Sequence, residues 1–298
     1  MSQGTRTIRS EIRRLTRSGD SRVICPVTVV AVEPLTPGFS RVVVRGDGLA
    51  AYWTIRPADA FKLMIPPDGT GSVRMPKLGP NGAPVWPADR PLPLMRAFSV
   101  RSFDPATLRL TFDVALHGAG PAMTWLASTR PGDTLVLLGT RREFSIGDGV
   151  ANHLLIGDPT SLPAIASIVE SLDAPATVFL QVESEDDQVL VPGDVQWIVG
   201  PPGVGPDSPL EKAVRSYPRL RGRTQAWLAA EAGVVRSLRP YLLKDLAVQR
   251  DDLHTVAYWI AGQTAEGRDA EQMRWYAKAG AEGLDTTDPA VLQGLEFS

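Results

Sequence analysis

The sequence RAFSV at residues 96–100 is followed by LRLTFDVALH at 108–117 and by GAGPAMTW at 118–125. The first two stretches alternate apolar and polar residues, which predicts two β-strands. In the third stretch a glycine precedes Pro121, and proline is favoured in the first turn of a helix. Together the three stretches predict two strands that lead through a glycine-containing loop into a helix start.

The rest of the first half repeats the two-residue alternation. Short strands are expected at residues 27–33, 39–45, 60–65, 95–101, 108–116 and 134–139. Six such strands without long helical patterns predict an antiparallel Greek-key β-barrel. Residues 66–93 are rich in proline and glycine, and we expect them to form a long loop without a regular element.

After about residue 149 the pattern changes to apolar strands that alternate with amphipathic helices, which is typical of a parallel-sheet α/β domain. Strands are expected at 153–157, 177–182, 195–199, 225–229 and 254–260, and helices at 162–172, 210–216, 233–246 and 269–279. Pro240 is expected to kink or break its helix. The predicted organisation is a basic, solvated arm at 1–20, a barrel at 21–149 and an α/β domain at 150–298.

Composition excludes several classes of protein. Cys25 is the single cysteine among 298 residues, so an internal disulfide and a multi-cysteine metal or iron–sulfur site are excluded. The histidines, His117, His153 and His254, lack metal-ligand spacing, so no metal site is expected. The net charge of −2 argues against nucleic-acid binding. Without a signal-like or membrane-spanning apolar run, we expect a soluble cytoplasmic protein with no integral membrane segment.

Arg96, Phe98 and Ser99 are the first candidate ligand-binding residues. On a strand, the guanidinium can pair with a diphosphate, the aromatic ring can stack on a flat ligand, and the hydroxyl can bond the edge of a flavin ring. The alternative is an ordinary strand with a solvated arginine. His117, at the end of the next strand, is either an acid–base group or a structural residue.

The loop Gly118 to Ala122 is the second candidate. Glycines directly before a helix start leave backbone N–H groups exposed, and these can bind a phosphate without a lysine. The loop includes Gly120 and Pro121. The alternative is a tight loop that enters a surface helix.

Two turns at the carboxyl edge of the predicted parallel sheet are the third candidate, because ligands of such sheets bind there. The first contains Gly157, Asp158, Thr160 and Ser161, and the second contains Glu231 and Gly233. Either helix start can hold a nucleotide phosphate. The alternative at both turns is a side chain that only caps or favours the helix start, since no glycine-rich dinucleotide motif or P-loop is present.

In this order, the motifs resemble the siderophore-interacting protein family, FAD-containing ferric-siderophore reductases of the ferredoxin-reductase-like class. The resemblance covers about residues 25–262. It includes the Arg-x-aromatic-Ser strand, His117-Gly118 and Gly120-Pro121-Ala122. Further matching segments lie at residues 59–66, 130–141, 157–165, 227–233 and 257–259.

The resemblance implies a role for each matching residue. The FAD set would be Arg96, Ala97, Phe98, Ser99, His117, Gly118, Gly120, Pro121, Ala122 and Trp125. The nicotinamide-nucleotide set would be Gly157, Asp158, Thr160, Ser161, Glu231 and Gly233. The set for an anionic ferric siderophore would be Lys62, Arg141 and Trp259. Electrons would come from NADH, NADPH or a ferredoxin, no catalytic side chain beyond the flavin is implied, and a monomer is expected.

Three departures from the family pattern leave alternatives open. Phe98 stands where tyrosine is common, Pro159 replaces an acidic residue, and Ile260-Ala261 replaces basic residues after the Tyr-Trp pair. The alternatives are a flavoprotein reductase with another acceptor, such as a quinone, free flavin or a partner protein, and a non-catalytic protein that binds a siderophore or flavin.

Overall fold

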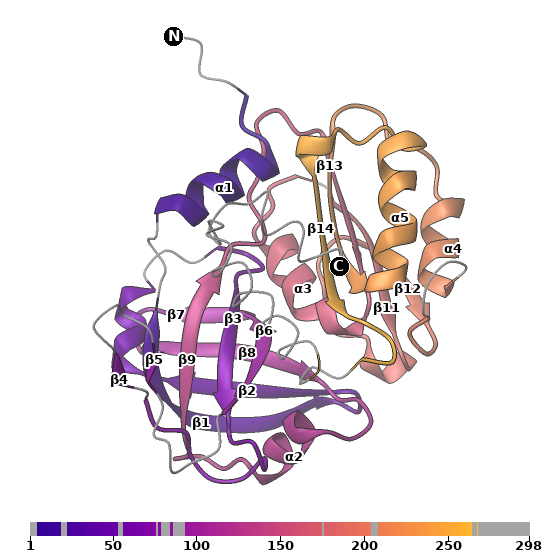
Figure 1. The fold of residues 1–298 in the computed structure, drawn as a ribbon. Helices are drawn as coiled ribbons and strands as arrows, with labels where there is room; N and C mark the ends of the chain where they lie inside the picture. The colour runs from indigo at the N-terminus through magenta and orange to yellow at the C-terminus, as the bar shows by residue number, and fades with distance from the viewer. Residues whose placement is uncertain are drawn as a thin grey trace.

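The fold comes from a computed structural model. It describes residues 5–18, 23–52, 56–75, 77–78, 84–85, 93–174, 176–203, 208–263 and 267. A seven-stranded antiparallel sheet is followed by a five-stranded parallel sheet, and Figure 1 shows the two side by side. The predicted fold class is confirmed. The helix expected at 269–279 lies outside the described residues, and the exact domain boundaries stay a prediction.

The antiparallel sheet closes into a barrel, in the strand order β6-β3-β9-β1-β2-β8-β7. Its strands are β1 (Ile24–Thr36), β2 (Phe39–Arg45), β3 (Ala60–Ile65), β6 (Leu94–Ser99), β7 (Ser102–Asp104), β8 (Arg109–Ala115) and β9 (Thr134–Arg141). Just after β6, the Arg101 N–H donates to the Thr111 carbonyl of β8 at 2.9 Å. Because Arg101 directly precedes β7, this bond extends the pairing of β7 with β8. Contacts between β6, at one end of the strand order, and β8, next to the other end, close the barrel.

The barrel interior is apolar because alternate residues of each strand point inward. Helix α2 (Pro121–Ser128) closes one end of this core with Trp125, which is buried. The 3-10 helix η1 (Asp47–Ala51) contributes the buried Leu49. Cys25 also lies in this core, and burial raises the pKa of its thiol to about 11. A thiol in that state is a packing residue and not a reactive group.

The expectation that residues 66–93 hold no regular element is wrong. Strands β4 (Lys77–Leu78) and β5 (Pro84–Val85) pair antiparallel, with Lys77 opposite Val85 and Leu78 opposite Pro84. A two-residue ladder needs few backbone bonds, so a proline can belong to it without disrupting a larger sheet.

The parallel sheet has the strand order β12-β11-β10-β13-β14. Its strands are β10 (Asn152–Gly157), β11 (Ala176–Val182), β12 (Asp194–Val199), β13 (Thr224–Glu231) and β14 (Leu253–Trp259). The helices are α3 (Leu162–Glu170), α4 (Pro209–Ser216) and α5 (Ala232–Lys244), with 3-10 turns η2 (Pro159–Ser161), η3 (Glu185–Asp187) and η4 (Arg250–Asp252). Separate apolar clusters cover its two faces, so the central strands are apolar on both sides.

Helix α5 runs from Ala232 to Lys244 without a break, so of the expected kink or break at Pro240 the break does not occur. Pro240 removes one backbone hydrogen bond, but it is exposed. Val235, Leu238 and Leu242 are buried on the other side of the helix and hold it against the sheet. Tertiary packing therefore outweighs the local cost of the proline.

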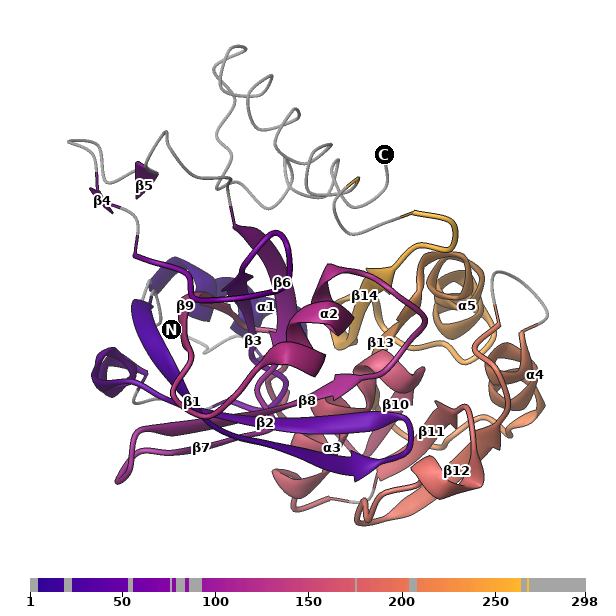
Figure 2. The ribbon, with the colours of Figure 1, turned by 90° about the horizontal axis from the view of Figure 1, so that it is seen from below.

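The barrel and the parallel sheet share a packed interface. Figure 2 shows the β1–β2 hairpin passing in front of α3 and reaching toward the parallel strands. The turn of this hairpin contacts Asp187, whose Oδ1 accepts hydrogen bonds from the Thr36 hydroxyl at 2.8 Å and the Gly38 N–H at 2.6 Å. The Arg101 guanidinium also forms a two-bond ion pair with Glu170, at 2.6 and 2.7 Å.

The solvated arm expected at residues 1–20 is instead a packed helix, α1 (Ile8–Ser18). Ile8 is fully buried and Leu15 is 7% exposed, whereas Arg13 is exposed. Apolar residues at helical spacing give α1 one buried face. The abundance of arginine in this segment conceals that face in the sequence.

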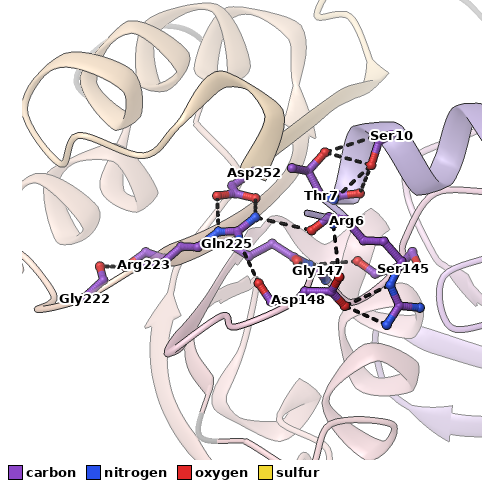
Figure 3. A network of polar contacts seen from close by, with 11 residues as sticks. Arg6, Thr7, Ser10, Ser145, Gly147, Asp148, Gly222, Arg223, Gln225 and Asp252 are labelled. Atoms are coloured by element: carbon purple, nitrogen blue, oxygen red, sulfur yellow. Dashed lines mark hydrogen bonds and ion pairs between the residues drawn. The ribbon is translucent and has the colours of Figure 1, made fainter. Parts of the chain in front are cut away.

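Polar contacts fix the start of α1 to the second domain (Figure 3). The Arg6 guanidinium donates to Asp148 at 2.8 Å, and the Asp148 N–H donates to the Arg6 carbonyl at 3.0 Å. Arg223 donates to the same carbonyl and forms two 2.8 Å bonds with Asp252. Helix α1 therefore belongs to the packed structure.

We expect Ile8→Ala to lower the free energy of unfolding by about 2–5 kcal/mol, because it removes a fully buried side chain and leaves a cavity. Urea unfolding measures this change, and the matched control is Arg13→Ala on the exposed face of α1. Equal stability of the two variants would contradict the packed position of α1.

Candidate functional site

The start of helix α2 has room for a ligand. Gly118 and Gly120 have φ angles of +39° and +153°, which favour glycine, and a Cβ atom at either position would meet nothing within 4 Å. Gly120 is the N-cap residue, and no side chain caps the helix. The first-turn N–H groups of α2 are therefore suited to an anion such as a diphosphate.

A pocket of about 690 Å³ lies beside α2. Its lining residues are Val32, Pro34, Ser40, Leu116, His117, Gly118, Met123, Leu126, Ala127, Thr129, Arg130 and Pro131. The volume suits part of a cofactor or a small molecule. His117 and Gly118 are the predicted cofactor residues that line it, whereas Arg96, Phe98 and Ser99 do not.

Strand β6 carries the other predicted cofactor residues. Arg96 is only 9% exposed, so it is not the solvated arginine of the alternative interpretation, and its guanidinium donates to the Met95 carbonyl at 3.0 Å. Ala97 is exposed and Ser99 is buried. The ligand roles of these residues stay predictions.

The ring of Phe98 joins β6 to α2. Its centroid lies 4.9 Å from that of Phe112 and 6.3 Å from that of Trp125. The structure thus brings two predicted cofactor residues, Phe98 and Trp125, together in one aromatic cluster. With phenylalanine in place of tyrosine, this cluster presents no hydroxyl at position 98.

Ser99 reaches the second domain. Its hydroxyl lies 3.4 Å from the Tyr258 hydroxyl at the end of β14. Burial, together with the nearby Glu143 carboxylate, raises the pKa of Tyr258, so this phenol stays protonated. The sequence shows Tyr258 as part of a Tyr-Trp pair, but no local pattern predicts its contact with a serine 159 residues away.

Glu143 is a buried carboxylate that the sequence analysis missed. It follows β9 and accepts hydrogen bonds from His254 Nε2 at 2.7 Å and from the Arg141 guanidinium. Its carbonyl accepts from the Trp227 indole at 3.1 Å. Although burial alone would raise the pKa of Glu143, Arg141 and His254 lower it, so the carboxylate is charged and joins the barrel to β13 and β14.

The residues predicted for an anionic substrate are divided between the two sheets. Lys62 and Arg141 lie on the paired strands β3 and β9, where Lys62 is opposite Leu138 and Arg141 is opposite Ala60. Trp259 lies on β14 in the parallel sheet. The indole N–H of Trp259 donates to Asp158 at 2.7 Å.

The first predicted nucleotide turn is tightly packed. The Asp158 carboxylate accepts hydrogen bonds from the N–H and the hydroxyl of Thr160, at 3.0 and 2.6 Å, and burial raises its pKa. The Ser161 hydroxyl donates to the Asp158 carbonyl at 2.8 Å. A Cβ at Gly157 would lie 1.8 Å from Ser161 Oγ, so Gly157 permits this close approach.

In the second predicted nucleotide turn, the Glu231 side chain caps the start of helix α5. Glu231 is 4% exposed, and its carboxylate accepts from the N–H groups of Gly233 at 2.6 Å and Val234 at 3.2 Å. It also accepts from the Ala261 N–H at 3.2 Å. As predicted, the turns lie at the carboxyl ends of the neighbouring strands β10 and β13.

The fold, an antiparallel barrel joined to a parallel-sheet domain, is ferredoxin-reductase-like. A family model described as the siderophore-interacting FAD-binding domain matches residues 28–144, and one described as siderophore-interacting protein matches residues 150–262. The chain belongs to the siderophore-interacting protein family. Helix α1 precedes both matched regions.

Individual relatives agree with this family. The chain is 30% identical over 259 residues to the uncharacterized protein Rv2895c of Mycobacterium tuberculosis, covering 80% of this chain and 90% of that protein. It is 26% identical over 241 residues to the ferric vibriobactin reductase ViuB of Vibrio cholerae, covering 78% and 88%. The crystal structure of a siderophore utilization protein from T. fusca matches with a TM-score of 0.71 at 26% identity, covering 82% and 97%.

Two features are absent from the described part of the chain. No group of three or more His, Cys, Asp or Glu side chains there has the arrangement of a metal site. None of the helices in the same residues has both the length and the apolar character that crossing a membrane requires.

Glu143→Gln is expected to lower the free energy of unfolding by about 1.5–3 kcal/mol at neutral pH, the range for a hydrogen bond to a charged group. The folded-state pKa of Glu143 lies below its ordinary value of 4.5, so the carboxylate stabilises the fold above that pH and stabilises it less as pH falls below it.

The measurement is urea unfolding of both proteins between about pH 7 and about pH 4. The difference between them should narrow towards the acidic end of this range. Glu183→Gln, at an exposed position, is the matched control. A difference that stays constant with pH would contradict the charged state of Glu143.

Proposed function

We propose that this chain is an FAD-dependent ferric-siderophore reductase. Electrons from NADH, NADPH or a ferredoxin-type donor would pass through FAD to the Fe(III) of a bound siderophore, and Fe(II) would be released for iron assimilation. The observation that carries this proposal is the uncapped start of α2, within the region that matches the FAD-binding family domain. We further propose that the protein is a cytoplasmic monomer.

The residues around α2 and β6 fit FAD. Open space at Gly118 and Gly120 leaves the backbone accessible to a diphosphate, and Arg96 supplies a cation from β6. Phe98 offers a flat apolar ring, and Ser99 offers a hydroxyl to the ring edge of a flavin. When bound, FAD would accept electrons as a pair or one at a time and pass them on singly, which suits an acceptor that takes one electron.

Reduction of a bound ferric siderophore requires residues that orient it and complement its charge, and it requires no proton transfer to the metal. Lys62 and Arg141 supply positive charge on neighbouring strands of the barrel, and Trp259 supplies an aromatic ring from β14. An anionic ferric siderophore complements this charge. Hard oxygen ligands hold Fe(II) less strongly than Fe(III), so reduction weakens the complex. The relative named ferric vibriobactin reductase supports this choice of substrate.

We expect Arg96→Ala to weaken FAD retention by about tenfold or more, because it removes the cation proposed to contact the diphosphate. Lys62→Ala is the matched control, since its proposed role is at the substrate. Fluorescence titration of the unloaded protein with FAD measures both dissociation constants. Equal dissociation constants in the two variants would contradict the assignment of Arg96.

We reduce the FAD-loaded protein anaerobically with dithionite and mix it with a ferric siderophore. It is expected to be reoxidised faster than free reduced FAD at the same concentration. Stopped-flow absorbance with an Fe(II) trap compares a ferric catecholate, a ferric hydroxamate and a quinone. If only the quinone reoxidises the protein, the acceptor is different. If the protein neither takes up FAD nor reduces iron, it is a binding protein.

A further inference from the structure

We infer that Asp158 and Glu231 are positioning residues that hold the end of β14 at Ser99, and that the carboxyl edge of the parallel sheet has no subsite for a dinucleotide diphosphate. This inference rests on the proposed function and selects between its electron donors. A one-electron carrier protein of the ferredoxin type becomes the reductant that this chain suits. The resemblance to the family had assigned both carboxylates to a nicotinamide nucleotide.

The first predicted nucleotide turn has no backbone N–H group from Pro159 to Pro163 that is available to a phosphate. Pro159 and Pro163 have no N–H group. The Thr160 N–H donates to the Asp158 carboxylate and the Ser161 N–H to the Asp158 carbonyl, both at 3.0 Å. The remaining N–H, of Leu162, donates to the Pro159 carbonyl. Every N–H from Pro159 to Pro163 is therefore bonded.

In the second predicted nucleotide turn, a carboxylate likewise occupies the backbone N–H groups. A single oxygen of Glu231 accepts from the N–H groups of Gly233 and Val234, which open α5. A phosphate at this turn would have to displace that carboxylate from both donors. It would also lie beside a buried acidic group, and like charges repel strongly where water is excluded.

The start of α2 provides the contrast within the same molecule. Its N-cap residue is Gly120, which has no side chain to bond the first-turn amides, and the surroundings of Gly118 and Gly120 are open. A diphosphate is thus accommodated at one helix start and excluded at two. The difference lies in what occupies the N–H groups at each start. The Glu231 carboxylate bonds them at α5, the capped 3-10 turn η2 and its flanking prolines occupy or remove them before α3, and Gly120 has no side chain at α2.

Both carboxylates have a second partner in the segment that ends β14. Asp158 accepts from the Trp259 indole at 2.7 Å, and Glu231 accepts from the Ala261 N–H at 3.2 Å. Between β13 and this segment, Glu231 pairs opposite Trp259 in the strand register. These contacts fix Trp259 and Ala261, which follow Tyr258 in the chain, and the Tyr258 hydroxyl lies 3.4 Å from that of Ser99.

A one-electron carrier does not need a diphosphate subsite. Two reduced carrier molecules would each lose one electron to the bound cofactor, and any protons taken up from water with these electrons would return to water when the electrons leave. Two ferric ions would each gain one of these electrons. Electrons balance without hydride transfer, so the closed sheet edge presents no obstacle to turnover.

The donor half of the inference is tested with the FAD-loaded protein. Isothermal titration with NAD+ and with NADP+ should show no saturable binding, with dissociation constants weaker than about 1 mM. Under anaerobic conditions, reduction by NADH or NADPH should rise linearly with concentration, whereas reduction by a reduced plant-type ferredoxin should saturate. Saturable nucleotide binding that is lost in Asp158→Ala or Glu231→Ala would overturn the inference.

The positioning half is tested by amide hydrogen exchange at residues 257–263. Glu231→Ala, which removes an acceptor, and Trp259→Phe, which removes the donor to Asp158 but leaves the helix cap intact, should each increase exchange about two- to tenfold. Glu231→Gln should largely restore protection, and Asp194→Asn on the exposed edge of β12 is the control. Unchanged exchange in both Glu231→Ala and Trp259→Phe would overturn this role.

These results are independent of the proposed function. Reoxidation of the dithionite-reduced protein by a ferric siderophore requires neither donor, so it reports on the acceptor alone. Nucleotide binding together with iron reduction would overturn the inference and leave the reductase intact. Absence of iron reduction, with amide hydrogen exchange as expected, would overturn the reductase and leave the positioning role of Asp158 and Glu231 intact.

Discussion

A helix start leaves backbone N–H groups without partners, and this constraint organises the region where the barrel meets the parallel sheet. The buried Asp158 carboxylate caps the 3-10 turn η2 that leads into α3, and the buried Glu231 carboxylate caps α5. At Gly120 no side chain does so, and the start of α2 stays open. The same requirement thus stabilises two turns and leaves the third suited to an anionic cofactor.

Buried polar contacts then hold the two domains in one arrangement. Glu143 contacts His254 and Trp227 across the interface, and Ser99 lies beside Tyr258. Removing one partner of such a buried group leaves an unsatisfied charge or dipole, which is costly. The geometry around the proposed flavin site therefore depends on residues of both domains.

Residue patterns in the sequence predict the helices and strands better than they predict the tertiary contacts. The strands at Phe39–Arg45 and Ala60–Ile65 have the expected bounds because their alternation is regular. Helix α1 was missed because its arginines hide the buried face of Ile8. Partners such as Ala261, which is 30 residues from Glu231, are set by tertiary packing and have no local signal.

The most direct test of the account is a crystal structure of the FAD-loaded protein. It should show the diphosphate on the first-turn N–H groups of α2, with the flavin ring beside Ser99 and the end of β14. Asp158 and Glu231 should keep their bonds to Thr160 and Gly233. A diphosphate bound at either of those carboxylate-capped turns would contradict the account.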